Sequence, residues 1–594
     1  MAGDNDTLIF AIDFGATYSG IGYIHTAEDR LPRFDNSLAA KKWDNEILYD
    51  DNKHTIRWGF QAHGDLRALK YFKLELDPEA RAQRKALRSA TESTRSLVGT
   101  YRTTSAVVGE YEVNRDAKAV CTDYLKAIYR TALEQMNNRW IPDFIKKAPK
   151  KFILTVPAIW TDSAKNATKQ CARRAFGQQA KIELIAEPQA AAVYTLSQAH
   201  MVKSVRPGDH YVICDAGGGT VDLITYCVKK IDPLELVESI PGTGEACGSI
   251  FLNRAFEAFL QDRLGRYYNG RRSEQLERCL EDMRRRFDAE IKQHFTGNRD
   301  ARWNFWRMAF QPRTALRTQV DEISLVPPEL YGAHIDGTEE NCLIITGRDV
   351  AHMFEPTVTR VLNLIRAQIT TLFNRRGHRP QLAGIVLVGG FGQNSYLFKR
   401  VKDEFQRLAE ITQPPDAWAS VTLGALSWGM SNQTVTARKL TRCYGQEIHL
   451  KYNPDCGYPS VRHPFTGERS QRAMQWFVVA GNEVSVDQPL EFPLVAYCDP
   501  SGEAKLTIIL WAWSPSREGE SPPKVCTREC YKVGNMTIDL EGPRRRAPSL
   551  CPRLDGRGYY QMLDFTMQLL FANEIIFRAV FQGTTQYARV DYTD

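Results

Sequence analysis

LIFAIDFGATYSGIGYIHT, residues Leu8 to Thr26, joins two apolar runs through a turn of small residues. The first run ends in the carboxylate of Asp13, and the second begins at Ile21. Short runs rich in β-branched and aromatic residues and bounded by glycine are typical of buried strands. The stretch therefore predicts a β-hairpin.

The turn of this hairpin has the composition of an anion-binding turn. Glycine lets backbone N–H groups approach an anion closely, and consecutive N–H groups form an anion-binding nest. An acid at the strand end, here Asp13, suits a hydrated divalent cation held next to a phosphate. A purely structural hairpin explains one such motif equally well, so the interpretation depends on the rest of the chain.

The bulk composition indicates a soluble globular protein of several domains. The chain has 594 residues, which at about 150 residues per domain suggests about three or four domains. Hydrophobic residues make up 43% and charged residues 25% of the chain, as in ordinary globular proteins. The net charge of +7 is too small for this length to indicate binding to nucleic acid or to a membrane.

The cysteines and the N-terminus indicate a reducing compartment. The 13 cysteines are odd in number and lack paired spacings, and the opening residues MAGDNDT lack the features of a signal peptide. We therefore expect a cytoplasmic or nuclear protein. Cys526 and Cys530 lie close in sequence, but no neighbouring Cys or His pair completes a zinc set. No stretch approaches the ~18 apolar residues of a membrane span, so none is predicted.

Residues 151–197 have the alternation of a parallel α/β fold. Phe152 to Pro157 predicts a strand, and a helix follows that has capping residues before it and Gly177 after it. A second strand, Ile182 to Ala186, runs into Glu187 and a further helix. Ligands of such sheets bind beyond the carboxyl ends of the strands, where Glu187 is expected.

The opening motif then occurs a second time. An apolar strand ends in Asp215, the turn Ala216 to Thr220 follows, and a returning strand runs from Val221 to Val228. Internal duplication is more informative than either hairpin alone. Two related lobes facing each other would place both carboxylates and both turns around one phosphate chain.

Two more glycine clusters follow, at residues 242–248 and 384–392. The first is no G-x-G-x-x-G fingerprint, and no Walker-type G-x-x-x-x-G-K-[ST] occurs, so Rossmann and P-loop folds are disfavoured. The second follows a predicted buried strand, where glycines would let a flat base or ribose lie against the backbone. Alternating runs separated by turn residues predict a β-rich module over residues 445–594.

Two basic runs are expected to be surface features. Arg284 to Arg286 lie in the basic, helical region 250–295, where a solvated helix face is favoured over an anion site. Pro543 to Pro548 is expected to be a surface loop, with a nuclear signal as the alternative.

Together these motifs resemble those of the actin/hexokinase/heat-shock ATPase superfamily, and within it the 70-kDa heat-shock (DnaK-type) proteins. DFGATYSG and DAGGGTVD are similar to the two phosphate motifs of that family, and IVLVGG to its adenosine motif. FILTVPAIWTDSAKNATKQCARRAFG and IELIAEPQAAAVY resemble its connecting region. The resemblance covers about residues 7 to 430. The variant GGFGQNSYL and the β-rich C-terminus resemble the divergent branch of fungi and of heat-shock-12-like proteins.

The resemblance implies an α/β fold, namely a duplicated actin-like ATPase (ribonuclease H-like) two-lobe nucleotide-binding fold followed by a β-rich C-terminal domain. Lobe I would span residues 1–206, lobe II residues 207–432, and a partner-binding module residues 433–594.

The resemblance also implies ATP or ADP as ligand, with Mg²⁺ held by Asp13 and Asp215. The implied catalytic residues are Glu187, Asp222, Asp215 and Lys73, of which Glu187 and Asp222 would orient water. From the residues alone Lys73 is expected to be solvated. The implied nucleotide-binding residues are Asp13, Gly15, Ala16, Thr17, Tyr18, Gly217, Gly218, Gly219, Thr220, Gly248, Gly389, Gly390, Phe391 and Gly392.

The function implied is that of a slow ATPase whose nucleotide state changes its conformation and whose C-terminal domain binds client or partner proteins. Ala16 replaces a threonine of the family motif, the adenosine motif lacks the usual Ser and Arg, and the linker and helical lid of the chaperones are missing. These departures motivate one alternative, a scaffold that binds ATP without useful turnover. A small-metabolite kinase of the same superfamily is a third hypothesis.

Overall fold

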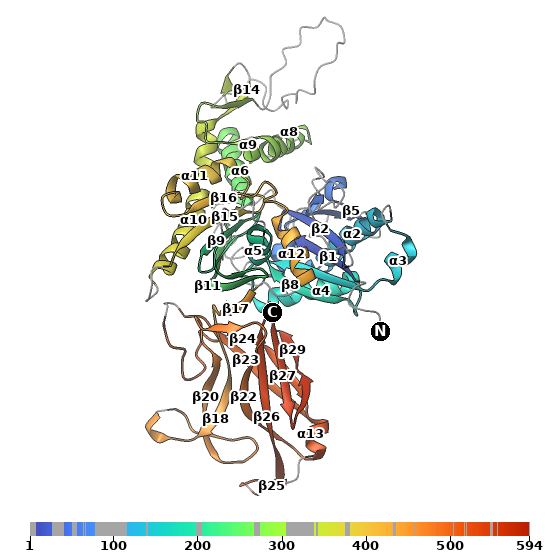
Figure 1. Cartoon of the computed structure of the whole chain (residues 1–594), viewed down its shortest axis with the longest axis vertical. Coiled ribbons are helices and arrows are strands. Elements are labelled where there is room, and N and C mark those ends of the chain that lie inside the picture. The colour runs from blue at the N-terminus through green and yellow to red at the C-terminus, as the bar shows by residue number, and fades with distance from the viewer. Residues whose placement is uncertain are drawn as a thin grey trace, which may run out of the picture. The chain divides into compact units, whose positions relative to one another are not determined.

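The computed structural model describes residues 7–26, 41–49, 56–62, 65, 67–77, 116–137, 140–197, 205–265, 274–304, 338–339, 342–374, 380–431, 435–456, 458–502, 504–515, 517, 519–546, 550–554, 556 and 558–592. They form two compact units (Figure 1). The first unit lies within residues 1–159, 168–224 and 243–432, and the second within 160–167, 225–242 and 433–594. The division predicted at residues 206 and 432 stays a prediction. In the described ranges, no helix is long and apolar enough to cross a membrane.

The first unit contains a five-stranded sheet of order β3-β2-β1-β7-β8. Its strands are β1 (Leu8–Phe14), β2 (Tyr18–His25), β3 (Lys41–Asp44), β7 (Lys150–Val156) and β8 (Lys181–Ala186). β1 and β2 are antiparallel, with Phe14 opposite Ser19, which confirms the predicted hairpin. β7 runs parallel to β1 and to β8, which confirms the predicted parallel α/β arrangement.

A second group of strands carries the repeated motif. It comprises β9 (His210–Ala216), β10 (Val221–Ile231), β15 (Leu382–Val388) and β16 (Glu410–Thr412). β15 lies between β9 and β16 and runs parallel to both, while β10 adjoins the other edge of β9. Asp215 near the end of β9 is paired with Val388 at the end of β15, so the glycines that follow β15, Gly389 and Gly390, begin beside this carboxylate.

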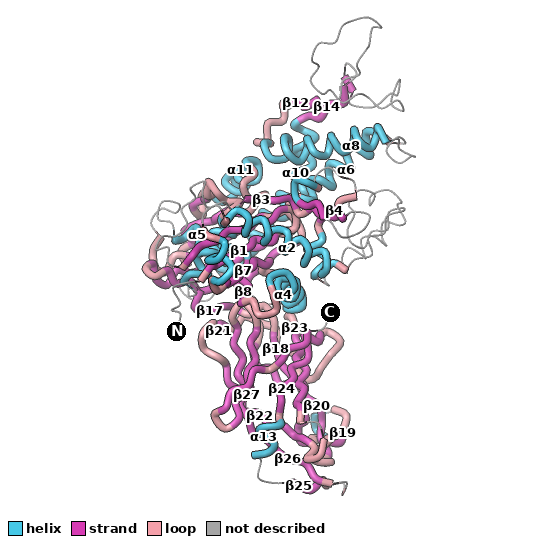
Figure 2. Tube along the Cα trace, turned by 90° about the vertical axis from the view of Figure 1, so that its right-hand side faces the viewer, coloured by secondary structure: helices cyan, strands magenta, loops and turns pink. Residues whose placement is uncertain are grey.

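Helices cover these sheets, as Figure 2 shows for α2, α4 and α5. The longer helices are α2 (Ala117–Met136), α4 (Asp162–Phe176), α5 (Glu187–Ser197), α6 (Ile250–Leu264), α8 (Glu274–Arg286), α10 (Gly347–Phe373), α11 (Ser395–Phe405) and α12 (Ser420–Ser431). α4 ends where expected, because Gly177 adopts a φ of 116°. Before α12 begins at Ser420, the Asp416 carbonyl accepts hydrogen bonds from the N–H groups of Ala419 and Ser420.

Shorter elements complete the first unit. The helical ones are α3 (Pro142–Lys147), the π-helix η3 (Phe287–Ile291), α9 (Lys292–His294), and the 3₁₀ turns η1 (Gly59–Gln61) and η2 (Phe72–Leu76). The strands are β4 (Glu46–Tyr49), β5 (Ile56–Trp58), β6 (Leu69–Lys70), β12 (Arg302–Asn304), β13 (Thr338–Glu339) and β14 (Cys342–Thr346).

The second unit is rich in strands, as predicted for residues 445–594 (Figure 2). One sheet contains β18 (Cys443–Lys451), β19 (Val461–Arg462), β20 (Arg469–Val478), β23 (Lys505–Trp513), β24 (Tyr531–Asp539) and β29 (Arg589–Tyr592). Another contains β22 (Leu490–Cys498), β25 (Leu550–Pro552), β26 (Tyr559–Phe571), β27 (Ile575–Phe581) and β28 (Thr584–Tyr587). The two share one core, in which Met536 and Leu510 of the first sheet meet Phe565 of the second.

Three further elements belong to this unit, namely β11 (Leu234–Glu245), most of which lies in it, β17 (Val435–Lys439) and β21 (Glu483–Ser485). β17 pairs with β11 and with β21.

Both basic runs reach the surface as expected, since the side chains of Arg285 and Arg545 are 55% and 76% exposed, but each differs from the prediction in one respect. Arg284 is largely buried, because its guanidinium pairs with the carboxylates of Glu257 and Glu281. The predicted basic loop is partly a helix, α13 (Glu541–Arg546), in which Arg544 donates to the Gly502 carbonyl at 2.8 Å. Residues 547 and 548 of that run lie outside the described ranges.

A stack of aromatic rings holds the first sheet against the helices. The ring of Phe152 lies 5.2 Å from that of Phe10 and 4.4 Å from that of Phe176, measured between centroids. Phe152→Ala should lower the free energy of unfolding by roughly 3–5 kcal/mol, because a buried ring is replaced by a cavity. Urea titration followed by circular dichroism measures the loss. Ile141→Ala, at a position that is 71% exposed, is the control, and equal midpoints for the two variants would contradict the packing described.

Candidate functional site

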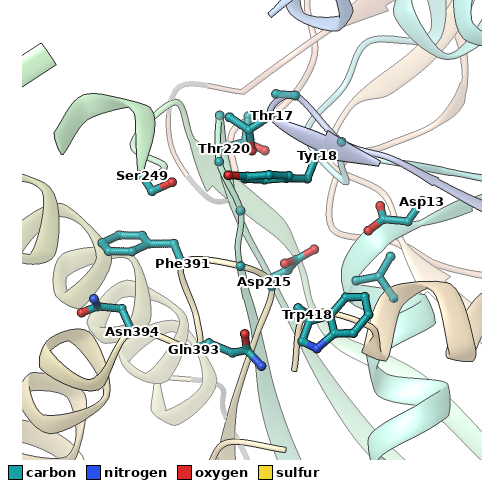
Figure 3. Close-up of a pocket in the computed structure, with 18 of the residues that line it drawn as sticks. Asp13, Thr17, Tyr18, Asp215, Thr220, Ser249, Phe391, Gln393, Asn394 and Trp418 are labelled. Carbon is teal, nitrogen blue, oxygen red and sulfur yellow. The ribbon is translucent and has the colours of Figure 1, made fainter. Parts of the chain in front are cut away.

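Both Asp-bearing hairpins face one cavity of about 650 Å³ in the first unit (Figure 3). The predicted residues that line it are Asp13, Gly15, Ala16, Thr17, Tyr18, Lys73, Glu187, Asp215, Gly217, Gly218, Gly219, Thr220, Gly389, Gly390 and Phe391. Both copies of the duplicated motif therefore contribute to one site. The cavity volume lies within the usual range for small-molecule sites, about 300–1,000 Å³.

The two carboxylates sit where strands end. Asp13 is near the end of β1, and its Oδ1 accepts a hydrogen bond of 3.0 Å from the Thr155 hydroxyl of β7. Asp215 ends the apolar run of β9, and a Cβ on Gly389 would lie only 2.3 Å from its Oδ1. Gly389 also has a φ of 86°, so both space and backbone conformation require glycine there.

The second turn is held in place by the residues just before α6. The carbonyls of Gly217, Gly218 and Gly219 accept hydrogen bonds of 2.9–3.1 Å. Their donors are the N–H groups of Ser249, Ile250 and Gly248, respectively. Within a trans peptide the C=O and N–H bonds are antiparallel. The N–H groups of Gly218, Gly219 and Thr220 therefore point away from this segment, in a turn that lines the cavity, as an anion-binding nest requires.

Three predicted site residues do not line the cavity. Gly248 lies behind the second turn, where a Cβ would come within 2.4 Å of the Gly218 carbonyl oxygen. Gly392 donates its N–H to the Ala216 carbonyl at 2.9 Å. Asp222 is buried, and its carboxylate accepts the N–H of Ile159 at 3.2 Å. These residues support the turns from behind.

Lys73 is not solvated, contrary to the expectation from its immediate sequence. Its side chain is 2% exposed, and its Nζ lies 2.9 Å from Oε1 of Glu187. Lys73 lies on η2, directly after Tyr71, whose φ of 58° turns the chain there. Burial of this lysine depends on a carboxylate 114 residues further along the chain, so no local pattern indicates it.

Burial is also the main cause of an unusually high pKa at Glu187. It raises the pKa of this carboxyl to about 7, with a contribution from Asp13 and Asp222, while the Lys73 ammonium opposes the shift. Burial likewise raises the pKa of Asp222, against hydrogen bonds from Thr220 and from the Ile159 N–H. A carboxyl with a pKa near neutrality is suited to accept a proton at physiological pH.

The sequence analysis missed most of the wall opposite the hairpins. Its lining residues are Lys292, Gln293 and His294 of α9, and Gln393, Asn394, Ser395, Pro414, Pro415 and Trp418. Asn394 joins two parts of this wall, because it caps α11 and donates to the Lys292 carbonyl at 2.7 Å. Figure 3 shows Phe391, Gln393 and Asn394 on one side of the cavity and Trp418 near Asp13. Gln393, Asn394 and Ser395 belong to the variant GGFGQNSYL, from which no ligand contact was predicted, and the other residues belong to none of the motifs quoted above.

Ala16 packs against the opposite turn. A Cβ on Gly219 would lie 2.9 Å from the Ala16 Cβ, and one on Gly218 would lie 2.0 Å from the Thr17 hydroxyl. The two turns therefore approach each other more closely than side chains on Gly218 and Gly219 would permit. Ala16, which stands where the family motif has a threonine, therefore packs its methyl group against Gly219.

The donor set fits a polyphosphate with a hydrated divalent cation. The turns offer backbone N–H groups, and Asp13 and Asp215 offer carboxylate oxygens. Mg²⁺ is usually bound by one or two carboxylates together with water and phosphate oxygens, so two aspartates are sufficient.

Comparison with known proteins gives three informative similarities. No protein-family model matches the chain. Heat shock 70 kDa protein 12A of Homo sapiens is 22% identical over 90% of this chain and 85% of its own length. Heat shock 70 kDa protein 12B of Homo sapiens is 22% identical over 90% of this chain and 84% of its own length. Chaperone protein DnaK of Stenotrophomonas maltophilia (strain R551-3) is 31% identical over 25% of this chain and 22% of its own length.

Gly248→Ala tests the support of the second turn. The new Cβ would displace the Gly217 and Gly218 carbonyls, so we expect a loss of stability of roughly 1–3 kcal/mol. Because the N–H groups of the turn would move with the carbonyls, affinity for the implied ligand, Mg-ATP, should fall as well. Differential scanning fluorimetry and calorimetric titration measure the two effects. Gly542→Ala is the control, since the nearest atom to a Cβ there is 3.9 Å away, and equal behaviour of both variants would contradict the arrangement.

Proposed function

Since this chain is a divergent, heat-shock-12-like member of the 70-kDa heat-shock protein family, we propose that it binds ATP and ADP with Mg²⁺ and hydrolyses ATP slowly. The observation that carries the proposal is the placement of two Asp-bearing hairpins on the wall of one cavity. Phosphoryl transfer depends mainly on positioning and charge neutralisation, for which this cavity has the groups.

Asp13 and Asp215 would hold the hydrated Mg²⁺, which neutralises negative charge on the phosphate oxygens when bound. The turns Gly15–Tyr18 and Gly217–Thr220 bind the phosphates through their N–H groups. Phe391 and Gly390 lie on the part of the wall that suits the nucleoside, because glycine allows a flat ring to approach the backbone.

Glu187 is the residue that orients and deprotonates the attacking water. In its charged form the carboxylate accepts a hydrogen bond from water. It takes up the proton as the water oxygen bonds to the γ-phosphorus and the bond from this phosphorus to the ADP oxygen breaks, so that ADP and phosphate are released. The Lys73 ammonium, 2.9 Å from this carboxylate, stabilises the charged form and adds positive charge near the phosphates. Asp222 holds the turn that follows β7 by accepting the Ile159 N–H.

The resemblance extends the proposal to the whole molecule. Residues 1–206 and 207–432 form the two lobes of a duplicated actin-like ATPase fold, and the nucleotide state changes lobe closure. The β-rich module, residues 433–594, binds a client or partner protein in a chaperone-like role. The protein acts in the cytoplasm or the nucleus.

One observation favours a second candidate, a nucleotide-gated scaffold without useful turnover. Ala16 is buried against Gly219 and brings no hydroxyl to the phosphate turn. A hydrogen bond to a charged group contributes about 1.5–3 kcal/mol, so its loss would slow hydrolysis if the bond forms only in the transition state. Normal Mg-ATP binding without product formation would favour the scaffold over the ATPase.

Calorimetric titration with Mg-ATP tests the binding site. We expect the wild type to bind, and Asp215→Asn to bind at least about tenfold more weakly with Mg²⁺ present, because one cation ligand loses its charge. Asp209→Asn is the matched control, since Asp209 is also buried but lies before β9, where it accepts the Arg206 N–H at 2.8 Å. Failure of the wild type to bind millimolar ATP would overturn the proposed function.

The pH dependence of single-turnover hydrolysis tests the role of Glu187. Below its pKa of about 7 the carboxyl is protonated and cannot accept the proton, so the rate should fall about tenfold per pH unit on the acid side. Lys73→Met should move this limb to higher pH, because the charged form loses its cation. Glu187→Gln should remove the limb and slow hydrolysis by roughly 10²–10⁴-fold.

A second Lys–Glu pair provides the control for this experiment. Lys151 and Glu183, with Nζ and Oε2 3.0 Å apart, lie outside the cavity lining. Glu183→Gln should leave the profile unchanged. An unchanged profile in Glu187→Gln would exclude Glu187 as the proton acceptor.

A further inference from the structure

The first turn, Gly15 to Ser19, is held by a side chain from a distant part of the sequence. Asn45 lies between β3 and β4 and is 2% exposed. Its Nδ2 donates to the Gly15 carbonyl at 2.5 Å, and its backbone N–H donates to the Thr17 carbonyl at 2.8 Å. Its Oδ1 accepts a hydrogen bond of 2.7 Å from the Ser19 hydroxyl. One residue thus contacts three positions of the turn.

The chemistry of its partners fixes the orientation of the Asn45 amide. The Gly15 carbonyl can only accept, so the NH₂ group must face it and the oxygen must face the other way. On that side are two hydroxyls, those of Ser19 and of Tyr124 from α2, each 2.7 Å from Oδ1. Tyr124 is fully buried, so it cannot exchange this contact for one with solvent.

This arrangement determines where the N–H groups of the turn point. C=O and N–H are antiparallel within a trans peptide, so carbonyls of Gly15 and Thr17 directed at Asn45 turn the N–H groups of Ala16 and Tyr18 away from it. Residues 15 to 18 line the cavity. The two N–H groups therefore lie on the side of the turn away from Asn45, where they are available to an anion in this cavity.

The second turn follows the same rule with different donors. There the backbone N–H groups of residues 248–250 hold three successive carbonyls. In the first turn one side-chain amide and one backbone N–H, both from Asn45, hold alternate carbonyls. Each turn is thus supported on its carbonyl side by hydrogen-bond donors.

We propose that Asn45 is a positioning residue for phosphate binding, and that Tyr124 fixes the amide of Asn45. The inference rests on the proposed function and deepens it, because it assigns recognition of the polyphosphate to the peptide groups of a turn set by Asn45. Such recognition needs no hydroxyl at Ala16. It concerns the phosphates alone, so the nucleoside part of the ligand is bound independently of Asn45.

Two substitutions at Asn45 separate this role from general stability. Asn45→Ala removes every side-chain contact. Asn45→Asp keeps the shape and can accept from Ser19 and Tyr124, but it places a negative oxygen against the Gly15 carbonyl. We expect both variants to bind Mg-ADP at least about tenfold more weakly than the wild type in calorimetric titration. Their affinity for adenosine, measured by ligand-observed NMR, should stay within about twofold.

Tyr124→Phe is the milder variant, because Asn45 keeps its contacts with the turn and loses only one donor to its oxygen. We expect it to bind Mg-ADP about three- to fivefold more weakly, with unchanged adenosine affinity. Tyr226→Phe is the matched control. Tyr226 is equally buried, and its hydroxyl has no hydrogen-bond partner among the described residues. The Tyr226→Phe variant should therefore bind both ligands as the wild type does.

The outcomes distinguish this inference from the proposed function. Wild-type Mg-ADP affinity in both Asn45 variants would overturn the inference, as would an equal loss of adenosine affinity, which indicates a purely structural role. Thermal unfolding of each variant shows whether it is folded. If the wild type binds no nucleotide, the proposed function fails. Titration of Mg-pyrophosphate into the wild type and Asn45→Asp then decides the inference, which is overturned if their affinities are equal.

Discussion

A peptide group can present its N–H to a ligand only if its carbonyl is satisfied elsewhere, and the candidate site depends on this constraint. The second turn meets it through the backbone of residues 248–250, and the first through Asn45. The need for such close support explains several glycines. Gly248 must approach the Gly218 carbonyl, and Gly389 must approach Asp215, more closely than any side chain would allow.

The buried pair of Lys73 and Glu187 places a second requirement on the same cavity. Charges removed from water are tolerated when they are paired. The pKa of Glu187 nevertheless stays near 7, because the effect of burial outweighs the attraction of Lys73. The pair also links η2 to the start of α5, so two segments that are far apart in sequence meet at the strand ends. The carboxyl proposed to accept the proton therefore also helps to hold η2 and α5 together.

Local patterns made much of the first unit predictable. The hairpins, the parallel strands β7 and β8, and the end of α4 at Gly177 follow from strand composition, helix caps and glycine conformation, all of which act within a few residues. Glu187 could be placed because the carboxyl ends of parallel strands share an edge. Lys73 was implied by the resemblance alone, and Asn45 and Trp418 were not predicted at all. The positions of these side chains depend on neighbours from other segments, and single side chains of these types carry no motif. The resemblance implied that Gly248 binds the nucleotide, whereas in the structure it supports the second turn from behind.

The different support of the two turns affects how readily each can change during evolution. The second turn is held by backbone N–H groups, which every amino acid except proline supplies, so most point mutations leave these donors in place. One of the two donors that hold the carbonyls of the first turn is a side-chain amide, which a single codon change can remove or replace. Among close homologues, the substitutions that change phosphate affinity should therefore concentrate at position 45 and at the residues that contact it. The support of the second turn should change little.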